Sequence, residues 1–233
     1  MLTVENLSFA YGTVGILRDI SMAMKTARVT CVIGRNGVGK STLMKNIVGL
    51  LRASNGTIQL GDTDITSLPA NKRAHAGLGY VPQGRQIFSK LTVHENLRVG
   101  LQARCDGLKT IPEEIYSLFP VLKEMGKRRG GDLSGGQQQQ LAIGRALVGD
   151  PKVLVLDEPT EGIQPNIIQQ IGKVLRELVE NRQITVVLVE QYLDFVREFG
   201  HDFYIMDRGM VCLLYTSDAA DEGLGVDLGG RRI

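Results

Sequence analysis

The sequence predicts an α/β protein in which a mostly parallel β-sheet is covered by helices on both faces. Continuous apolar runs at residues 153–156, 184–189 and 203–206 are separated by segments with helical periodicity, as expected of buried parallel strands. Residues 2–10 instead alternate apolar and polar side chains, which is typical of an antiparallel strand with one buried face. A further apolar run at 29–33 stops at a glycine-rich loop that precedes a helical pattern. Together these patterns predict a parallel core with an antiparallel β region at the N-terminus.

The elements of the N-terminal half follow from the spacing of apolar residues. Antiparallel strands are expected at 2–10 and 16–24, with Gly12 in the turn between them. The run at 29–33 predicts a buried strand, and the spacing of Leu43, Ile47 and Leu50 predicts a helix that begins after Gly39. Further strands are expected at 57–60 and 78–81.

The middle of the chain is expected to be a helical insertion at about residues 84–150. Thr92 with Glu95, and Ser134 with Gln137, have the spacing of capping boxes that start helices. The predicted organisation is one domain over residues 1–214 that contains this insertion. Residues 215–233 have four glycines and no amphipathic period, which predicts a disordered or non-native tail.

Composition excludes several classes of protein. Lys and Arg number 27 against 25 Asp and Glu, a net charge of +2 that argues against nucleic acid as the main partner. The sequence has no stretch of eighteen apolar residues, so no membrane-spanning helix is expected. The three cysteines are an odd number and show no metal-ligand pattern, which favours a location in the reducing cytosol for this protein. They are Cys31, Cys105 and Cys212.

Residues 34–41, GRNGVGKS, match the phosphate-loop pattern GxxxxGK followed by Ser or Thr. The glycines let backbone N–H groups curl around an anion, Lys40 adds a positive charge, and Ser41 offers a hydroxyl to Mg²⁺. The loop lies between a predicted strand and a predicted helix, as its mechanism requires. The residues expected to bind ATP here are Gly34, Arg35, Asn36, Gly37, Val38, Gly39, Lys40, Ser41 and Thr42.

Two adjacent carboxylates, Asp157 and Glu158, follow the apolar run at 153–156. The carboxyl ends of parallel strands face the crevice where ligands bind in open α/β sheets. Many strands end in an acid, so the pattern gains its weight from the phosphate loop. With that loop, it predicts that Asp157 holds Mg²⁺ through Ser41 or water, and that Glu158 is the general base for attack on the γ-phosphate.

The segment Leu133-Ser-Gly-Gly-Gln137 resembles the signature of ABC ATPases, and the resemblance covers about residues 1–212. It implies a P-loop NTPase (RecA-like) core with an N-terminal antiparallel β subdomain and an inserted helical subdomain. It also implies that Ser134, Gly135, Gly136 and Gln137 of one subunit close over ATP held by a second subunit. A serine before two glycines at a helix N-terminus makes a second anion-binding site, whereas a simple helix cap would leave the glycines unexplained.

The resemblance gives roles to three further residues. Tyr11 stands where an aromatic ring stacks on adenine, and Gln83 stands where a glutamine reaches Mg²⁺ and senses the membrane subunit. Gln191 stands where most members have a histidine that contacts the γ-phosphate, and Gln164 replaces a usual aspartate. An amide donates a hydrogen bond but cannot carry a proton away. ATP binding is therefore expected, while the rate of hydrolysis and its coupling stay open.

Longer segments resemble one branch of this family. DEPTEGIQP together with VEQ resembles the ATPases of branched-chain amino acid and urea importers, and GGDLSGGQQQQLAIGRAL with PEEIYSLFPVLKEM resembles most the second ATPase subunit of urea importers. The implied partners are a second copy or a paralogous ATPase, membrane permease subunits and, indirectly, a periplasmic solute-binding protein. The implied location is the cytoplasmic face of the cell membrane.

Other functions share some of these motifs. DNA-repair and chromosome-organising ABC ATPases place a long coiled coil between the phosphate loop and the signature, where this chain has about 90 residues without a heptad. A GTPase would need a guanine-reading acid, which residues 71–74 lack. A regulatory module that binds ATP and hydrolyses it poorly remains an alternative.

Overall fold

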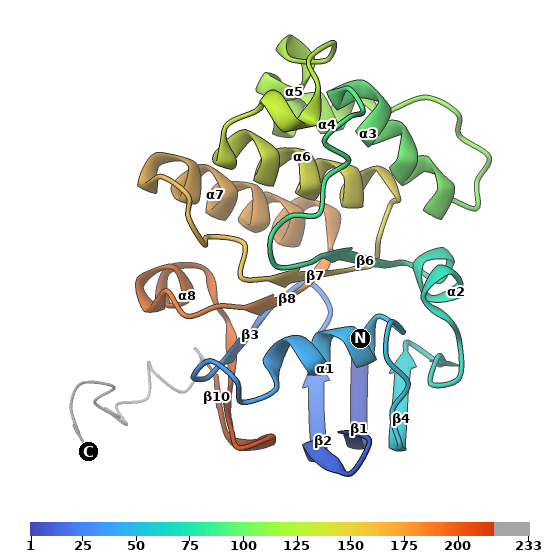
Figure 1. Ribbon diagram of the computed structural model, residues 1–233, viewed down its shortest axis with the longest axis vertical. Helices are drawn as coiled ribbons and strands as arrows, with labels where there is room; N and C mark the ends of the chain where they lie inside the picture. The colour runs from blue at the N-terminus through green and yellow to red at the C-terminus, as the bar shows by residue number, and fades with distance from the viewer. Residues whose placement is uncertain (217–233) are drawn as a thin grey trace.

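The computed structural model describes residues 1–216, and their side chains as far as residue 212. Two β-sheets form its centre (Figure 1). An antiparallel sheet of strand order β2-β1-β4-β5 consists of β1 (Leu2–Tyr11), β2 (Val14–Met24), β4 (Asn55–Leu60) and β5 (Thr63–Asp64). The second sheet, of order β10-β9-β3-β8-β7-β6, consists of β3 (Val29–Ile33), β6 (Leu78–Val81), β7 (Val153–Asp157), β8 (Thr185–Val189), β9 (Asp202–Asp207) and β10 (Met210–Thr216).

Helices lie on both sides of the second sheet, which is parallel except for β10. Helix α1 (Lys40–Ile47) and the antiparallel sheet lie on one side (Figure 1). Helix α7 (Pro165–Arg182) covers the other side, and beyond it lies a helical group from the middle of the chain. That group consists of α3 (Val93–Gly100), α4 (Glu113–Leu118), α5 (Pro120–Glu124) and α6 (Gly135–Val148), with the short helices η1 (Leu101–Ala103) and η2 (Gly130–Asp132). Two further helices are α2 (Ala70–His75) and α8 (Leu193–Phe199).

The parallel strands are buried on both faces, which explains their continuous apolar sequences. In β7, Leu154 and Leu156 pack into the core under the helical group, whereas Val153 and Val155 pack against α1 and the antiparallel sheet. Successive side chains of a strand point to opposite faces, so such a strand needs an apolar residue at every position. The sheet therefore divides the interior into two hydrophobic cores.

The predicted α/β fold, its N-terminal antiparallel region and its helical middle segment are all present. Both capping boxes form: Thr92 accepts from the N–H of Glu95, and Ser134 from that of Gln137. No strand lies between β6 and β7 in the described chain. The limits proposed for the helical insertion, 84 and 150, stay a prediction.

Several predicted boundaries differ from the structure, including the starts of β2 at Val14 and β4 at Asn55, which were expected at residues 16 and 57. The helix expected to reach Leu50 ends at Ile47, because Gly49 adopts a positive φ of 79° that breaks the helix. Leu50 is left 57% exposed. The last strand continues through Thr216, so Tyr215 and Thr216 belong to it, and residues 217–233 of the predicted tail lie outside the described residues.

Candidate functional site

The phosphate loop follows β3 and leads into α1, as the sequence predicts. Gly37 and Gly39 have backbone φ values of 81° and 109°, which residues other than glycine rarely adopt. Lys40 is 5% exposed, and its Nζ donates to the carbonyl oxygens of Gly34 (2.7 Å) and Arg35 (2.9 Å). The amine is thus held inside the loop, at the N-terminus of α1, where an anion is electrostatically favoured.

The turn between β9 and β10 supports this loop from behind. The N–H of Gly209 donates to the carbonyl of Val38 at 3.1 Å, and its own carbonyl accepts from the N–H of Arg18 at 2.8 Å. A side chain at Gly34 would come within 2.5 Å of the carbonyl oxygen of Met206. The first glycine of the motif is therefore required by close packing against β9.

Asp157 and Ser41 face each other across the end of the sheet. The hydroxyl of Ser41 donates to Oδ1 of Asp157 at 3.2 Å. Asp157 is 2% exposed, and burial raises the pKa of its carboxyl, although the bond from Ser41 lowers it. A hydroxyl and a carboxylate are oxygen donors of the kind that Mg²⁺ prefers, and a cation would offset the cost of the buried charge. The pair therefore fits the predicted Mg²⁺ site.

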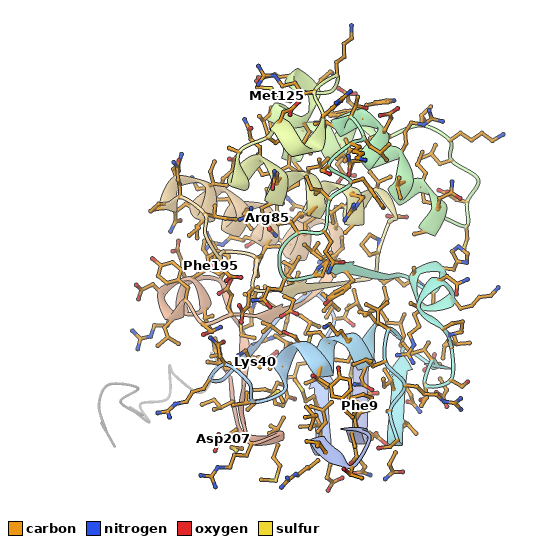
Figure 2. All side chains as sticks on the ribbon, in the orientation of Figure 1. Phe9, Lys40, Arg85, Met125, Phe195 and Asp207 are labelled. Carbon is orange, nitrogen blue, oxygen red and sulfur yellow. The ribbon has the colours of Figure 1, made fainter. Side chains whose placement is uncertain are left out.

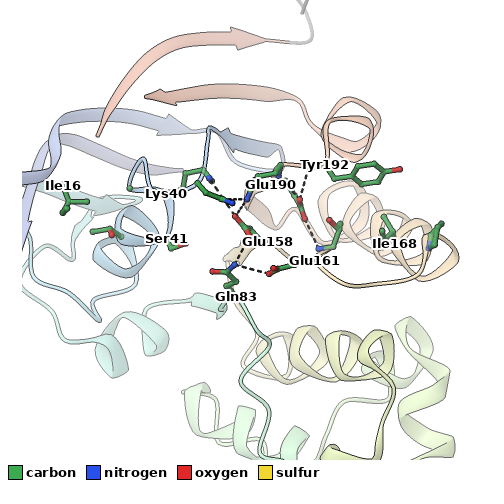
Figure 3. A pocket seen from close by; sticks show the side chains of 16 residues that line it. Ile16, Lys40, Ser41, Gln83, Glu158, Glu161, Ile168, Glu190 and Tyr192 are labelled. Atoms are coloured by element: carbon green, nitrogen blue, oxygen red, sulfur yellow. Dashed lines mark hydrogen bonds and ion pairs between the residues drawn. The ribbon is translucent and has the colours of Figure 1, made fainter. Parts of the chain in front are cut away.

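Glu158 lies at the centre of the site, where side chains from four segments meet (Figure 3). Its Oε2 accepts from the amide of Gln83 at 2.9 Å, and its Oε1 accepts from the amide of Gln191 at 2.5 Å. The Nζ of Lys40 lies 4.0 Å from Oε1. Gln191 also donates to Oδ1 of Asn36 at 2.7 Å, so one amide joins the loop after β8 to the phosphate loop.

A cleft of about 800 Å³ opens above these residues. Among the predicted residues it is lined by Asn36, Gly37, Gly39, Lys40, Ser41, Thr42, Gln83, Glu158 and Gln191. The structure adds Ile16, Thr160, Glu161, Pro165, Ile168, Glu190 and Tyr192. The cleft lies at the carboxyl ends of β3, β7 and β8, where parallel sheets bind ligands.

Nine predicted residues do not line this cleft within the described chain. Four of them, Gly34, Arg35, Val38 and Asp157, lie in the phosphate loop or bonded to it, and the other five lie elsewhere. Tyr11 is half exposed at the end of β1 and packs edge-on against Phe9, with ring centroids 4.8 Å apart. The signature residues Ser134, Gly135, Gly136 and Gln137 begin α6 and do not line it.

Arg85 connects the signature to the loop after β7. Its guanidinium packs against Gly135, where an added Cβ would lie 3.1 Å from Nη1, and it donates to the carbonyl of Glu161 at 3.1 Å. Figure 2 shows Arg85 and Lys40 on opposite sides of the large sheet. Arg85 therefore links the signature to the loop that follows Glu158.

Sequence reasoning missed the role of Glu190, a carboxylate that is 3% exposed and lines the cleft. It directly follows a buried strand, as Glu158 does, and that shared position is the signal by which it could have been found. The predicted metal ligand Gln83 is directed at Glu158 and Glu161 rather than at Asp157 (2.9 and 3.1 Å).

Comparisons with known proteins agree with this arrangement. Residues 17–161 match the family model described as ABC transporter. The high-affinity branched-chain amino acid transport ATP-binding protein BraG of Pseudomonas aeruginosa is 38% identical over 94% of this chain and 94% of its own. The probable branched-chain amino acid transport ATP-binding protein LivF of Archaeoglobus fulgidus is 36% identical over 94% of this chain and 93% of its own.

Solved structures share the fold over nearly the whole chain. A nucleotide-free ATP-binding cassette from an ABC transporter superposes with a TM-score of 0.83 at 29% identity, over 96% of this chain and 94% of that one. The ADP form of MJ1267, an ATP-binding cassette of an ABC transporter, gives 0.82 at 31% identity, over 96% and 94%. Among the described residues, no helix is long and apolar enough to cross a bilayer.

Proposed function

This chain belongs to the ABC transporter family as one of its ATP-hydrolysing subunits, and from that membership we propose that it powers the uptake of branched-chain amino acids through separate membrane subunits. The observation that carries the proposal is the cleft lined by Lys40, Ser41 and Glu158, with Asp157 bonded to Ser41 beside it. A cation and loop amides on one side and two carboxylates on the other suit a magnesium triphosphate.

We assign the chemistry of the cleft to the following residues. The amides of the phosphate loop and Lys40 would bind the phosphates of ATP. Ser41 and Asp157 would hold Mg²⁺, and the side-chain oxygen of Gln83 would be a further ligand while its NH₂ group donates to Glu158; the cation would supply positive charge to the site. Glu158 accepts a proton from the attacking water. Its two oxygens each accept one amide hydrogen bond already, from Gln83 and Gln191, and each has a lone pair left for water. The amides therefore orient the base without blocking it.

The solute is inferred from the relatives and from sequence resemblance. BraG and LivF are named for branched-chain amino acids, which supports that solute here. Urea is the second candidate, because the glutamine run at 137–140 and the segment at 112–125 resemble urea importers most. Under either solute, the partners are permease subunits and a periplasmic binding protein, and the chain sits on the cytoplasmic face of the membrane.

We also propose that ATP is bound between two subunits. Within the described chain, Ser134 and Gly136 lie away from the cleft that holds Lys40. A second subunit, identical or paralogous, would bring its own signature over that cleft. The stacking of Tyr11 on adenine is part of this proposal, since the half-exposed ring of Tyr11 offers an aromatic surface to a bound base.

The assignment of the base is tested by Glu158→Gln. A glutamine keeps the size of the side chain but cannot accept the proton, so we expect single-turnover hydrolysis to slow by roughly 10² or more. Binding of magnesium ATP, measured by isothermal titration calorimetry, should persist. Equal rates in the two proteins would rule out Glu158 as the base, and absence of magnesium-dependent ATP binding in the wild type would overturn the function itself.

The solute is tested by transport into proteoliposomes that contain this chain, its permease subunits and its binding protein. We expect ATP-dependent uptake of radiolabelled leucine that excess isoleucine reduces and excess urea does not. Uptake of labelled urea instead of leucine would favour the second candidate. ATP hydrolysis that no solute stimulates would contradict the assignment to an importer.

A further inference from the structure

Glu190 is a buried carboxylate that joins the two loops on which the catalytic side chains stand. Its Oε1 accepts from the backbone N–H of Thr160 at 2.9 Å. Its Oε2 accepts from the N–H groups of Gln191 (3.0 Å) and Tyr192 (3.3 Å). Three backbone donors can stabilise an ionised carboxylate in a site that is 3% exposed.

The loop held through Thr160 carries the proposed base. Thr160 is itself 7% exposed and lies two residues after Glu158, whose φ of 50° is a conformation that residues other than glycine seldom adopt. The next residue, Glu161, accepts the second hydrogen bond of Gln83 at 3.1 Å. Fixing the N–H of Thr160 therefore fixes the turn that aims the carboxylate of Glu158 into the cleft.

The loop held through Gln191 carries the amide that contacts that base. Gln191 donates to Oε1 of Glu158 at 2.5 Å and to Asn36 at 2.7 Å. These side-chain bonds depend on the position of the backbone, which the Oε2 bonds of Glu190 hold at the second and third residues after β8 (Figure 3). A single carboxylate thus sets the distance between the base and the amide.

We propose that Glu190 is a positioning residue for ATP hydrolysis, which keeps the side chain of Gln191 aligned with Glu158. Because Glu190 bonds both loops, a displacement of the segment 158–164 also displaces Gln191. This inference rests on the proposed function, because it assumes that Glu158 and Gln191 act on ATP. A glutamine at position 190 would keep the shape but place an NH₂ group against backbone N–H donors, so one side of the link would be lost.

The experiment compares Glu190→Gln with Asp202→Asn. Asp202 is a matched control, because it is also a buried carboxylate (2% exposed), starts strand β9 of the same sheet, and accepts a hydrogen bond from Arg28 away from the cleft. We expect Glu190→Gln to lower kcat by about 10- to 100-fold while KM for ATP changes little, since small misplacements of catalytic groups act mainly on the chemical step. Asp202→Asn should change the melting temperature and leave kcat near that of the wild type. An unchanged kcat in Glu190→Gln would overturn the proposal, as would an equal loss in the control.

A double-mutant cycle separates positioning from general structural support. Because Glu190 acts through Gln191, Glu190→Gln should reduce kcat much less in a Gln191→Ala background than in the wild type. Losses that multiply in the double variant would overturn the proposal. If Glu190→Gln does not fold, Glu190→Asp supplies the same comparison, since it keeps the charge but withdraws the carboxylate by one methylene group. Wild-type protein that hydrolyses no ATP would instead refute the proposed function, so the two failures are distinguishable.

Discussion

Asp157 shows how a single side chain of the site opposes stability. Burial is the largest influence on its carboxyl and raises the pKa above the ordinary value near 3.8. In the pH range between its unfolded and folded pKa values the folded chain binds more protons, so stability falls as pH rises. Above the folded pKa the cost is fully present. At neutral pH an ionised Asp157 therefore destabilises the protein when no cation is bound.

From this we predict that Asp157→Asn raises the melting temperature of the nucleotide-free protein at pH 7.5. The same variant should lose the further rise that magnesium ATP gives the wild type, because the charge that attracts the metal is gone. Differential scanning fluorimetry with and without magnesium ATP measures both effects. The control is Asp106→Asn, an exposed carboxyl whose pKa is lowered by its hydrogen bond from Arg104 and which should not gain stability. A fall in melting temperature for Asp157→Asn would contradict the argument.

Cys31 is expected to be inert although the chain has three free cysteines. Its thiol is fully buried in β3, and burial raises its pKa, with the charges of Glu190 and Asp202 adding to the effect. Only the thiolate reacts with maleimides at a useful rate. At pH 7.5 the native protein should be labelled at the exposed Cys105 and Cys212, and Cys31 should react only after denaturation. Mass spectrometry of labelled peptides checks this, and rapid labelling of Cys31 in the native protein would show that β3 opens.

The sequence was sufficient to predict the site residues that belong to a recognisable motif after a buried strand. Lys40 and Ser41 belong to the phosphate loop that follows β3, Asp157 and Glu158 stand at the end of β7, and the structure brings them together. Glu190 was not predicted as part of the site, because its partner Thr160 is 30 residues away along the chain and the bond is made to a backbone N–H. A backbone donor leaves no trace in a sequence pattern.

At the level of elements, α1 is held at its C-terminus by a buried arginine. Arg73 is 2% exposed and donates to the last carbonyls of α1, at Asn46 and Ile47 (2.7 Å each). It also donates to the carbonyls of Thr66 (2.7 Å) and Leu68 (2.9 Å). Burial lowers the pKa of its guanidinium. One side chain thus satisfies four carbonyl groups, two at the end of α1 and two in the segment before α2.

We predict that Arg73→Met lowers the free energy of unfolding by about 3 kcal/mol or more, because buried carbonyl groups lose their donors. Urea denaturation followed by circular dichroism measures the change. Lys72→Met on the same helix is the control, since its side chain is exposed and such substitutions usually shift stability by no more than about 0.5 kcal/mol. Similar losses in both variants would mean that α2, rather than the bonds of Arg73, is responsible.

Elements with strong local signals were predicted well, and short ones were missed. Strands 29–33 and 153–156 are recognisable because two buried faces demand unbroken apolar sequence. The six-residue α2 and the two-residue β5 were not predicted, because neither is long enough to show a period. Helix α2 also lacks a side-chain cap and an acid in its first turn. Such elements exist because tertiary contacts, here those of Arg73, hold them.

On the scale of the whole molecule, the nucleotide cleft and the signature lie in different parts of the fold. The signature begins α6 in the helical group, whereas Lys40 lies beyond the large sheet on α1 (Figures 1 and 2). If two subunits pack head to tail, each composite site takes one half from each chain. A defect in either half then disables both sites of a homodimer.

This arrangement predicts complementation between two inactive variants. Lys40→Ala removes the phosphate-binding half and Ser134→Arg blocks the signature half, so each protein alone should have little ATPase activity. In a heterodimer both defects fall in one site and the other is intact, so an equal mixture that exchanges subunits should recover about a quarter of wild-type activity. Steady-state ATPase assays before and after mixing test this. No recovery, despite exchange detected by fluorescence energy transfer, would contradict the shared site.

The turn between β9 and β10 stands directly behind the phosphate loop, bonded to Val38 through Gly209. The neighbouring side chain, Arg208, is 87% exposed. A fluorophore attached at that position would therefore be connected to the phosphate loop through the backbone of the turn, while the dye itself would face solvent. It would provide an optical readout of pocket movement during turnover, at a residue that takes no part in the chemistry.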